Sequence, residues 1–110
     1  MYFEVSMNNQ YEFNDKKQLI NQLVNELPVL RAKLGASQAD IADRIGISRQ
    51  MLNSFETGKR EMTWTTFVAL IALFQNNEDT NNMLKNMDGF LRRVETELSV
   101  ENRIAKNFER

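Results

Sequence analysis

The fold is decided by the stretch SQADIADRIGISRQMLNSFETGKR, which spans residues 37–60. Ser37 is a typical helix N-cap, and Asp40 follows three residues later, as in a capping box. Gly46 lies where a chain leaving a helix must take a left-handed conformation. We therefore expect a helix over residues 38–45 that ends in a tight glycine turn, with three residues facing inward: Ile41, Ala42 and Ile45.

A second helix is predicted immediately after this turn, over residues 49–56. Ser48 is its expected N-cap and Gly58 its expected end, and Leu52 and Phe55 should form its buried face. A helix of this size fits the major groove of DNA. Polar side chains remain for the outer face, and their donors and acceptors match base edges: Arg49, Gln50, Asn53 and Ser54.

Residues 27–74 resemble the phage-repressor helix-turn-helix family, also described as Cro/C1-type or XRE-type. The family motif runs L-x-x-L-R-x-x-x-G-x-S-Q-x-x-I-A-x-x-x-G-I-S-x-x-x-(I/L)-x-x-(aromatic or I)-E-x-G-x-R, and this chain matches nearly every fixed position. The resemblance implies an all-α, five- or six-helix lambda-repressor-like DNA-binding domain, here with extra N- and C-terminal helices.

The resemblance also implies which residues read the DNA bases. The family's recognition-helix positions fall on Ser48, Arg49, Gln50, Asn53 and Ser54. Arg49 is the best candidate for reading guanine, because a guanidinium can bond O6 and N7 together. Gln50 suits adenine in the same two-bond manner. Asn53 and Ser54 are expected to touch either bases or the sugar-phosphate backbone.

Phosphate contacts are implied for Gln38, at the start of the first motif helix, through its amide and with help from the helix dipole. Lys59 and Arg60 follow the recognition helix and should neutralise phosphates. Arg31 and Glu56 stand at positions that pair in relatives and brace the recognition helix. The competing interpretation of the exposed members of this set is an ordinary solvated surface.

Two residues depart from the family pattern. Met62 stands where proline is usual, and Met51 is bulky where a small residue is usual. The first predicts a different loop after the recognition helix, and the second predicts a tilted helix or an added contact to a thymine methyl. All six methionines are interpreted as fillers of packing gaps rather than as a ligand set.

The segment before the motif divides into a polar start and a helical region. Residues 1–14 predict either a tail or a short strand. Helices are expected over residues 15–26 and 28–34, the second either separate or a kinked continuation, because Pro28 suits the first turn of a helix. Residues 15–76 are taken together as the DNA-binding domain.

After the motif, Thr63 should cap a helix that runs to about Phe74, followed by a polar connection over residues 76–79. A last helical region is expected over residues 80–98, with a possible continuation to Phe108. Residues 77–110 are interpreted as a region for dimerisation, because apolar residues recur there at spacings of three and four, as in a coiled coil: Leu84, Met87, Leu91, Val94 and Leu98. The alternative is that this stripe packs on residues 19–27 of its own chain.

Composition limits the other classes of function. The net charge of −1 argues mildly against DNA binding, but residues 31–60 hold six bases and three acids, a local balance of +3. The chain has no cysteine and no histidine and shows no phosphate-binding glycine loop, so neither an enzyme nor a cofactor or metal site is predicted. No run of apolar residues is long enough for a membrane helix, and a cytoplasmic protein is expected.

The sequence thus predicts a sequence-specific regulator of transcription that binds double-stranded DNA as a homodimer, with repression by operator occupancy as the favoured mode. Two alternatives stay open. The chain could be the antitoxin of a toxin–antitoxin pair, with a toxin partner held by residues 1–14 or 99–110. It could also be a protein-interaction module that no longer binds DNA.

Overall fold

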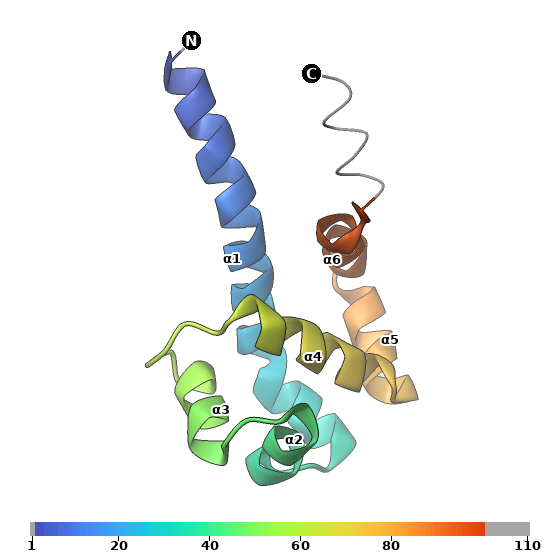
Figure 1. Cartoon of the computed structure of the whole chain (residues 1–110). Helices are drawn as coiled ribbons and strands as arrows, with labels where there is room; N and C mark the ends of the chain where they lie inside the picture. Colours follow the sequence, from blue (N-terminus) through green and yellow to red (C-terminus); the bar gives the residue numbers. More distant parts are fainter. Residues whose placement is uncertain (1, 101–110) are drawn as a thin grey trace.

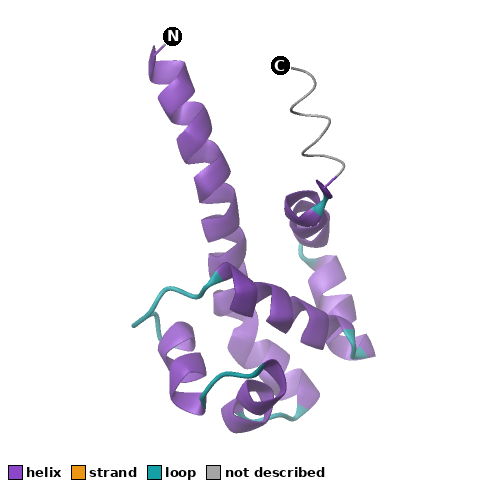
Figure 2. Ribbon diagram, in the orientation of Figure 1, coloured by secondary structure: helices purple, strands orange, loops and turns teal. Residues whose placement is uncertain are grey.

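The computed structural model describes residues 2–100, with side chains from residue 15 onward, and contains helices and loops but no strand in that range (Figure 2). The all-α fold class is therefore confirmed. Six helices follow one another in the chain: α1 (Tyr2–Leu34), α2 (Gln38–Ile45), α3 (Arg49–Glu56), α4 (Trp64–Gln75), α5 (Glu78–Asn86) and α6 (Phe90–Leu98).

Helix α1 is longer than the sequence predicts, and it corrects the expectation for the first residues of the chain. Residues 2–14 belong to this helix rather than to a tail or a strand, which is a correction, and α1 continues through Pro28, which is one of the two predicted alternatives. No glycine or proline precedes Pro28, so nothing in the sequence ends the helix earlier. Pro28 has no N–H to donate, so α1 lacks one backbone hydrogen bond there. Residues 28–34 are thus a continuation of the first helix and not a separate helix.

The two motif helices have the predicted bounds. Ser37 accepts a hydrogen bond from the Asp40 backbone N–H at 3.1 Å, and the Asp40 carboxylate accepts one from the Ser37 N–H at 3.2 Å, so the capping box is complete. Gly46 has a φ of 82°, in the left-handed region that glycine favours. Ser48 caps α3 by accepting from the Met51 N–H at 3.0 Å. In Figure 1, α2 and α3 lie beside each other near the C-terminal end of α1.

Helix α4 supplies the centre of the core, as expected. Thr63 caps it by accepting a hydrogen bond from the Thr66 N–H at 3.1 Å. The ring of Phe67 stacks on Trp64, with centroids 4.8 Å apart, and meets the edge of Phe90 at 6.1 Å. Buried apolar side chains from all six helices join this core, among them Leu23 and Leu27 of α1.

The last helical region is two helices, not the single helix predicted over residues 80–98. Asn77 caps α5, which therefore begins within the expected polar connection. The break before α6 falls at Gly89, whose φ of 68° places it in the left-handed region. The continuation to Phe108 that the sequence allows lies outside the described residues.

Helices α5 and α6 pack on α1 of the same chain. Leu84 and Val94, two members of the predicted coiled-coil stripe, are buried in the common core. The break at Gly89 prevents one continuous seam. For Leu84 and Val94 the structure therefore agrees with the alternative prediction, in which the apolar stripe packs within its own chain. Leu98 stays half exposed at the end of α6, and it is accompanied by Val100, which is 69% exposed.

Candidate nucleic-acid interface

Helix α3 presents the predicted recognition side chains on its outer face. Arg49 and Gln50 are exposed, whereas Asn53 and Ser54 are half-buried. Leu52 and Phe55, on the opposite side of the helix, are buried in the core. Because the inward face is fixed by these two residues, the polar face is held in one orientation relative to α1 and α2.

The hydroxyl groups of α3 are used within the helix itself. Ser48 is occupied as the N-cap, and Ser54 donates a hydrogen bond to the Gln50 carbonyl at 3.0 Å. A serine that bonds back to the preceding turn retains a lone pair for an external donor. Within the chain, therefore, the hydroxyl groups of Ser48 and Ser54 both bond to the backbone of α3.

The end of α3 is tied to α1 by a two-pronged ion pair. The Arg31 guanidinium donates from Nε to Glu56 Oε2 at 2.8 Å and from Nη2 to Oε1 at 3.1 Å. The Glu56 side chain is only 7% exposed and that of Arg31 is 23% exposed. The geometry is the brace that the family resemblance implies, and its two parallel bonds fix orientation as well as distance.

A hydrogen-bond relay that the sequence does not predict joins α2 to the outer face of α3. Arg49 donates from Nη1 to Gln38 Oε1 at 3.4 Å, and Gln38 donates from Nε2 to Asn53 Oδ1 at 3.1 Å. Gln38 therefore bonds two of the predicted base-reading residues at once. The three side chains are 11 and 15 residues apart in sequence, so only the angle between the two helices brings them together.

The loop after α3 carries the expected cations. Lys59 and Arg60 are exposed. Arg60 donates from Nη1 to the sulfur of Met51 at 3.1 Å, and its backbone N–H donates to the Ser54 carbonyl at 3.1 Å. Met51 is half-buried against the core, so its bulk serves as a packing surface and as a support for Arg60.

Met62 has a different role from the proline usual at its position. Its side chain is 3% exposed and belongs to the core, where it closes the gap between the loop and the helices. The described side chains of the other methionines, Met83 and Met87 among them, also pack against the core. This placement agrees with the interpretation of methionine as a gap-filler.

The first turn of α2 carries one perturbed carboxylate. The pKa of Asp40 lies below its usual value, chiefly because its carboxylate accepts a hydrogen bond from the Ser37 backbone N–H, with a second contribution from the Ser37 hydroxyl. A smaller contribution comes from the charge of Arg44, which donates to the Asp40 backbone carbonyl at 3.3 Å. Negative charge here is stabilised by the helix dipole.

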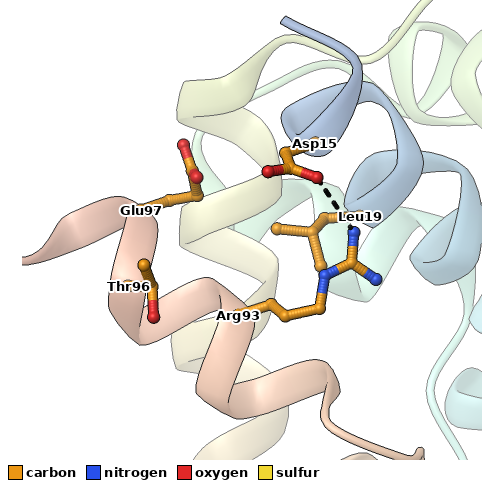
Figure 3. Close-up of a pocket in the computed structure, with 5 residues that line it drawn as sticks. All are labelled: Asp15, Leu19, Arg93, Thr96 and Glu97. Carbon is orange, nitrogen blue, oxygen red and sulfur yellow. Dashed lines mark ion pairs between the residues drawn. The ribbon is translucent and has the colours of Figure 1, made fainter. Parts of the chain in front are cut away.

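A small open depression lies between α1 and α6, lined by Asp15, Leu19, Arg93, Thr96 and Glu97 (Figure 3). The Arg93 guanidinium points at Asp15 across it, with Nη2 3.6 Å from Oδ1. It also donates to Gln18 at 3.1 Å and to Gln22 at 3.4 Å. The cation is thus already engaged by its own chain.

The described part of the chain contains neither a candidate metal site nor a helix suited to cross a membrane. Among the side chains of residues 15–100, no group of three or more carboxylate, histidine or cysteine side chains is placed to hold a metal ion. No described helix combines the length and apolarity that crossing a membrane requires.

Comparison with known families agrees with the geometry of α2 and α3. The family model described as "Helix-turn-helix domain" matches residues 22–80, which is more than half of the chain. The protein therefore belongs to the helix-turn-helix domain family. No curated protein and no solved structure matches the chain significantly.

Proposed function

We propose that the protein is a sequence-specific regulator of transcription that places α3 in the major groove of double-stranded DNA. The observation that carries this proposal is the outer face of α3, where Arg49, Gln50 and Asn53 are grouped on a helix whose other face is buried. An eight-residue helix of this kind is the element with which helix-turn-helix proteins reach base edges. The motif also supports the narrower Cro/C1 or XRE-type assignment.

The distribution of charge supports the same role. The whole chain is slightly acidic, but residues 31–60 carry a local excess of three positive charges. Lys59 and Arg60 are exposed in the loop that leaves the recognition helix. Cations at this place neutralise the phosphates that flank the groove, which gives affinity and its salt dependence. Gln38 begins α2 and offers its remaining amide hydrogen to a phosphate.

Binding as a homodimer completes the proposal. One helix-turn-helix covers a half-site only, which is too little to select a site in a genome. We propose that residues 15–76 bind the DNA and that residues 77–110 contribute to the dimer interface. Leu98, the last residue of α6, and Val100, just after the helix, support it, because these apolar side chains are 49% and 69% exposed. The favoured mode of regulation is repression, in which the bound dimer occupies an operator.

The oligomeric state is tested by sedimentation of the whole chain. The expected species has twice the 12.9 kDa of one chain at tens of micromolar. A 12.9 kDa species under these conditions would count against the homodimer without touching the fold of the single chain.

The DNA-binding test begins with selection of binding sites from random duplex DNA by the whole chain. Arg49→Ala should then cost about 1–3 kcal/mol at one base position and relax the preference there. Lys59→Ala should weaken binding to all sequences and lower the salt slope by about one.

A matched control for the loss of positive charge is Lys85→Ala, which removes an exposed lysine from α5. It should leave both the preference and the salt slope unchanged. If no duplex is enriched over the starting pool, the proposal of a DNA-binding regulator is wrong.

A further inference from the structure

We infer that Met51 positions Arg60 for DNA, so that this arginine binds one backbone phosphate through two parallel hydrogen bonds. The inference rests on the proposed function and deepens it, because it assigns the geometry of one phosphate contact and gives a role to a residue that departs from the family pattern. The observation that carries it is the hydrogen bond from Nη1 of Arg60 to the sulfur of Met51, with 3.1 Å between the two atoms.

Arg60 is attached to α3 at two points. Its backbone N–H donates to the Ser54 carbonyl at 3.1 Å, and its guanidinium reaches the sulfur of Met51, also at 3.1 Å. Residues three apart are neighbours on a helix surface, so the side chain of Arg60 runs back along α3 from Ser54 toward Met51. The cation therefore lies beside the recognition helix and not beyond its end.

Lys59, the neighbouring cation, differs from Arg60 in this respect. It is exposed, and its side chain makes no hydrogen bond or ion pair within the described residues. A lysine on a flexible stem neutralises phosphates as a point charge, without a preferred direction. We therefore expect the two cations to bind DNA differently, Lys59 by its charge alone and Arg60 from a fixed direction.

The bond to Met51 leaves one edge of the Arg60 guanidinium for a ligand. It uses Nη1, whereas Nε and Nη2 have no partner within the described residues. Arg31 uses this same edge for the Glu56 carboxylate, with bonds of 2.8 Å from Nε and 3.1 Å from Nη2. A phosphate accepts from arginine in the same forked geometry. Arg60 can therefore hold a phosphate with two bonds while the sulfur keeps the third nitrogen.

The place of Met51 on α3 favours a phosphate over a base as the partner of Arg60. Met51 is half-buried on the flank of the helix, between the buried Phe55 and the exposed Gln50. A helix with its side chains is about 10–12 Å across and the major groove is about 12 Å wide, so the flanks of a helix in the groove lie against its walls. The phosphate backbones form those walls, and contacts to them orient the protein.

Methionine supplies at position 51 what a small residue could not. Its long side chain packs against the core and also presents sulfur to Arg60. Thioether sulfur is a weak acceptor, so it orients the guanidinium without competing strongly with a phosphate. Because the flexible arginine is partly ordered before DNA arrives, less conformational entropy is lost on binding. Met51 is thus a positioning residue for the phosphate contact.

The central experiment removes the sulfur and keeps the volume. Met51→Leu is a change that cores tolerate, but leucine cannot accept a hydrogen bond. Dissociation constants are measured with the whole chain and the duplex that it enriches most from random DNA. We expect Met51→Leu to weaken binding about threefold, since a bond to a weak acceptor contributes at the lower end of the usual range. The same change in an Arg60→Ala chain should leave the affinity unchanged.

Met51→Gln tests whether the acceptor is what matters. The glutamine amide oxygen can accept from Nη1 of Arg60, so this variant should bind more tightly than Met51→Leu. That gain should vanish in the Arg60→Ala chain. Lys59→Ala provides the matched control, because Met51→Leu should cost the same factor in affinity whether or not Lys59 is present.

Arg60→Lys tests the two-bond contact. Lysine keeps the charge but has no planar fork, so the affinity should fall about tenfold while the salt slope stays the same. The preference for bases should not change at any position, because a phosphate carries no sequence information.

The contact between Met51 and Arg60 is tested without DNA, by NMR of the methionine methyl groups in the whole chain. The Met51 methyl signal should shift in Arg60→Ala and stay in place in Lys59→Ala. A signal that ignores Arg60→Ala overturns the inference.

Three results with DNA also overturn the inference and leave the proposed function intact. Equal effects of Met51→Leu with and without Arg60 would assign Met51 to packing alone. An unchanged affinity in Arg60→Lys would exclude the two-bond contact, and a base preference lost in Arg60→Ala would exclude a phosphate as the partner. If no duplex is enriched at all, the proposed function fails and the inference fails with it.

Discussion

Two helices are tied to the same long helix by arginine, one near the C-terminal end of α1 and the other near its middle. Near the C-terminal end of α1, Arg31 holds α3 through Glu56, with two bonds of 2.8 and 3.1 Å. Near the middle of α1, Nη2 of Arg93 in α6 lies 3.6 Å from Oδ1 of Asp15, a pair whose side chains are 38% and 29% exposed. The first pair is largely shielded from water and the second is not.

The apolar contacts of the two helices complete the comparison. Helix α6 buries Phe90 fully and Val94 almost fully, so its arginine adds to an attachment that already exists. Helix α3, with eight residues, likewise buries two, Leu52 and Phe55, so the two helices do not differ in the number of side chains that they bury. The two attachments therefore differ in their ion pairs: Arg31 and Glu56 share two parallel bonds shielded from water, whereas Arg93 and Asp15 form a longer and more exposed pair.

The largest effect is expected from Phe90→Ala, which removes the main apolar attachment of α6. Truncating a buried phenylalanine leaves a cavity and typically costs about 3–5 kcal/mol. Phe90 is fully buried and meets the edge of Phe67, so we expect a loss within this range in the free energy of unfolding. Urea titration measures it.

Leu98→Ala is the matched control on the same helix. Leu98 is 49% exposed, so truncating it should cost far less than the loss at Phe90. Equal losses for the two variants would contradict the claim that α6 is held by the apolar side chains that it buries.

The second effect is expected from Arg31→Met, which leaves the Glu56 carboxylate largely buried without its cation. Removing one partner of a fully buried pair costs about 3–5 kcal/mol, and the partial exposure of Arg31 lowers our expectation to about 2 kcal/mol. The loss should appear in urea titration, and DNA affinity should fall because the end of α3 loses its brace.

A double-mutant cycle distinguishes the tie from simple packing. Arg31→Met combined with Glu56→Leu removes both charges and should recover most of the stability lost in Arg31→Met. If the double variant is less stable than Arg31→Met alone, the brace does not act through its charge.

The sequence predicts the motif more completely than the rest of the fold. The bounds of α2 and α3 follow from strong local signals, since Ser37, Gly46 and Ser48 each require one backbone conformation. The sequence does not predict the break between α5 and α6, because apolar residues keep their spacing on both sides of Gly89. The spacing of apolar residues indicates which side chains face the core, but it does not indicate which glycine adopts a left-handed backbone conformation.

For the candidate site, single residues could be predicted but their connections could not. The family resemblance predicts DNA contacts for Gln38, Arg49 and Asn53 one residue at a time. That Gln38 reaches both others depends on the crossing of α2 and α3, which no local pattern encodes. The continuation of α1 through Pro28 has a similar origin, because Leu27 and Leu30 on either side of it are fully buried in the core.

A smaller effect is expected from Arg93→Met, which breaks the more exposed of the two ion pairs. The variant removes the contact with Asp15 and the hydrogen bonds to Gln18 and Gln22 but keeps the apolar stem. Exposed ion pairs contribute about 0–1 kcal/mol, so the loss in urea titration should stay below that of Arg31→Met. A loss equal to that of Arg31→Met would remove the distinction between the two arginines.

The smallest effect concerns Asp40, a fully exposed carboxylate in the capping box of α2. Its pKa in the folded chain lies below the ordinary value of 3.8, chiefly because it accepts a hydrogen bond from the Ser37 N–H. Folding is therefore favoured by the ionised group above pH 3.8, and this contribution is lost as the pH falls through the lowered folded-state pKa.

Asp40→Asn should accordingly be less stable than the unchanged chain at neutral pH, and the difference should shrink in acid. Urea titrations from pH 7 to pH 2.5 would measure this. Repeating them in 1 M salt separates the two causes, because salt screens the attraction of Arg44 but leaves the hydrogen bond from Ser37 in place. A difference that persists in salt assigns the effect to the cap, and one that disappears assigns it to Arg44. In either case it should be smaller than the loss at Arg31, because water already solvates the Asp40 carboxylate.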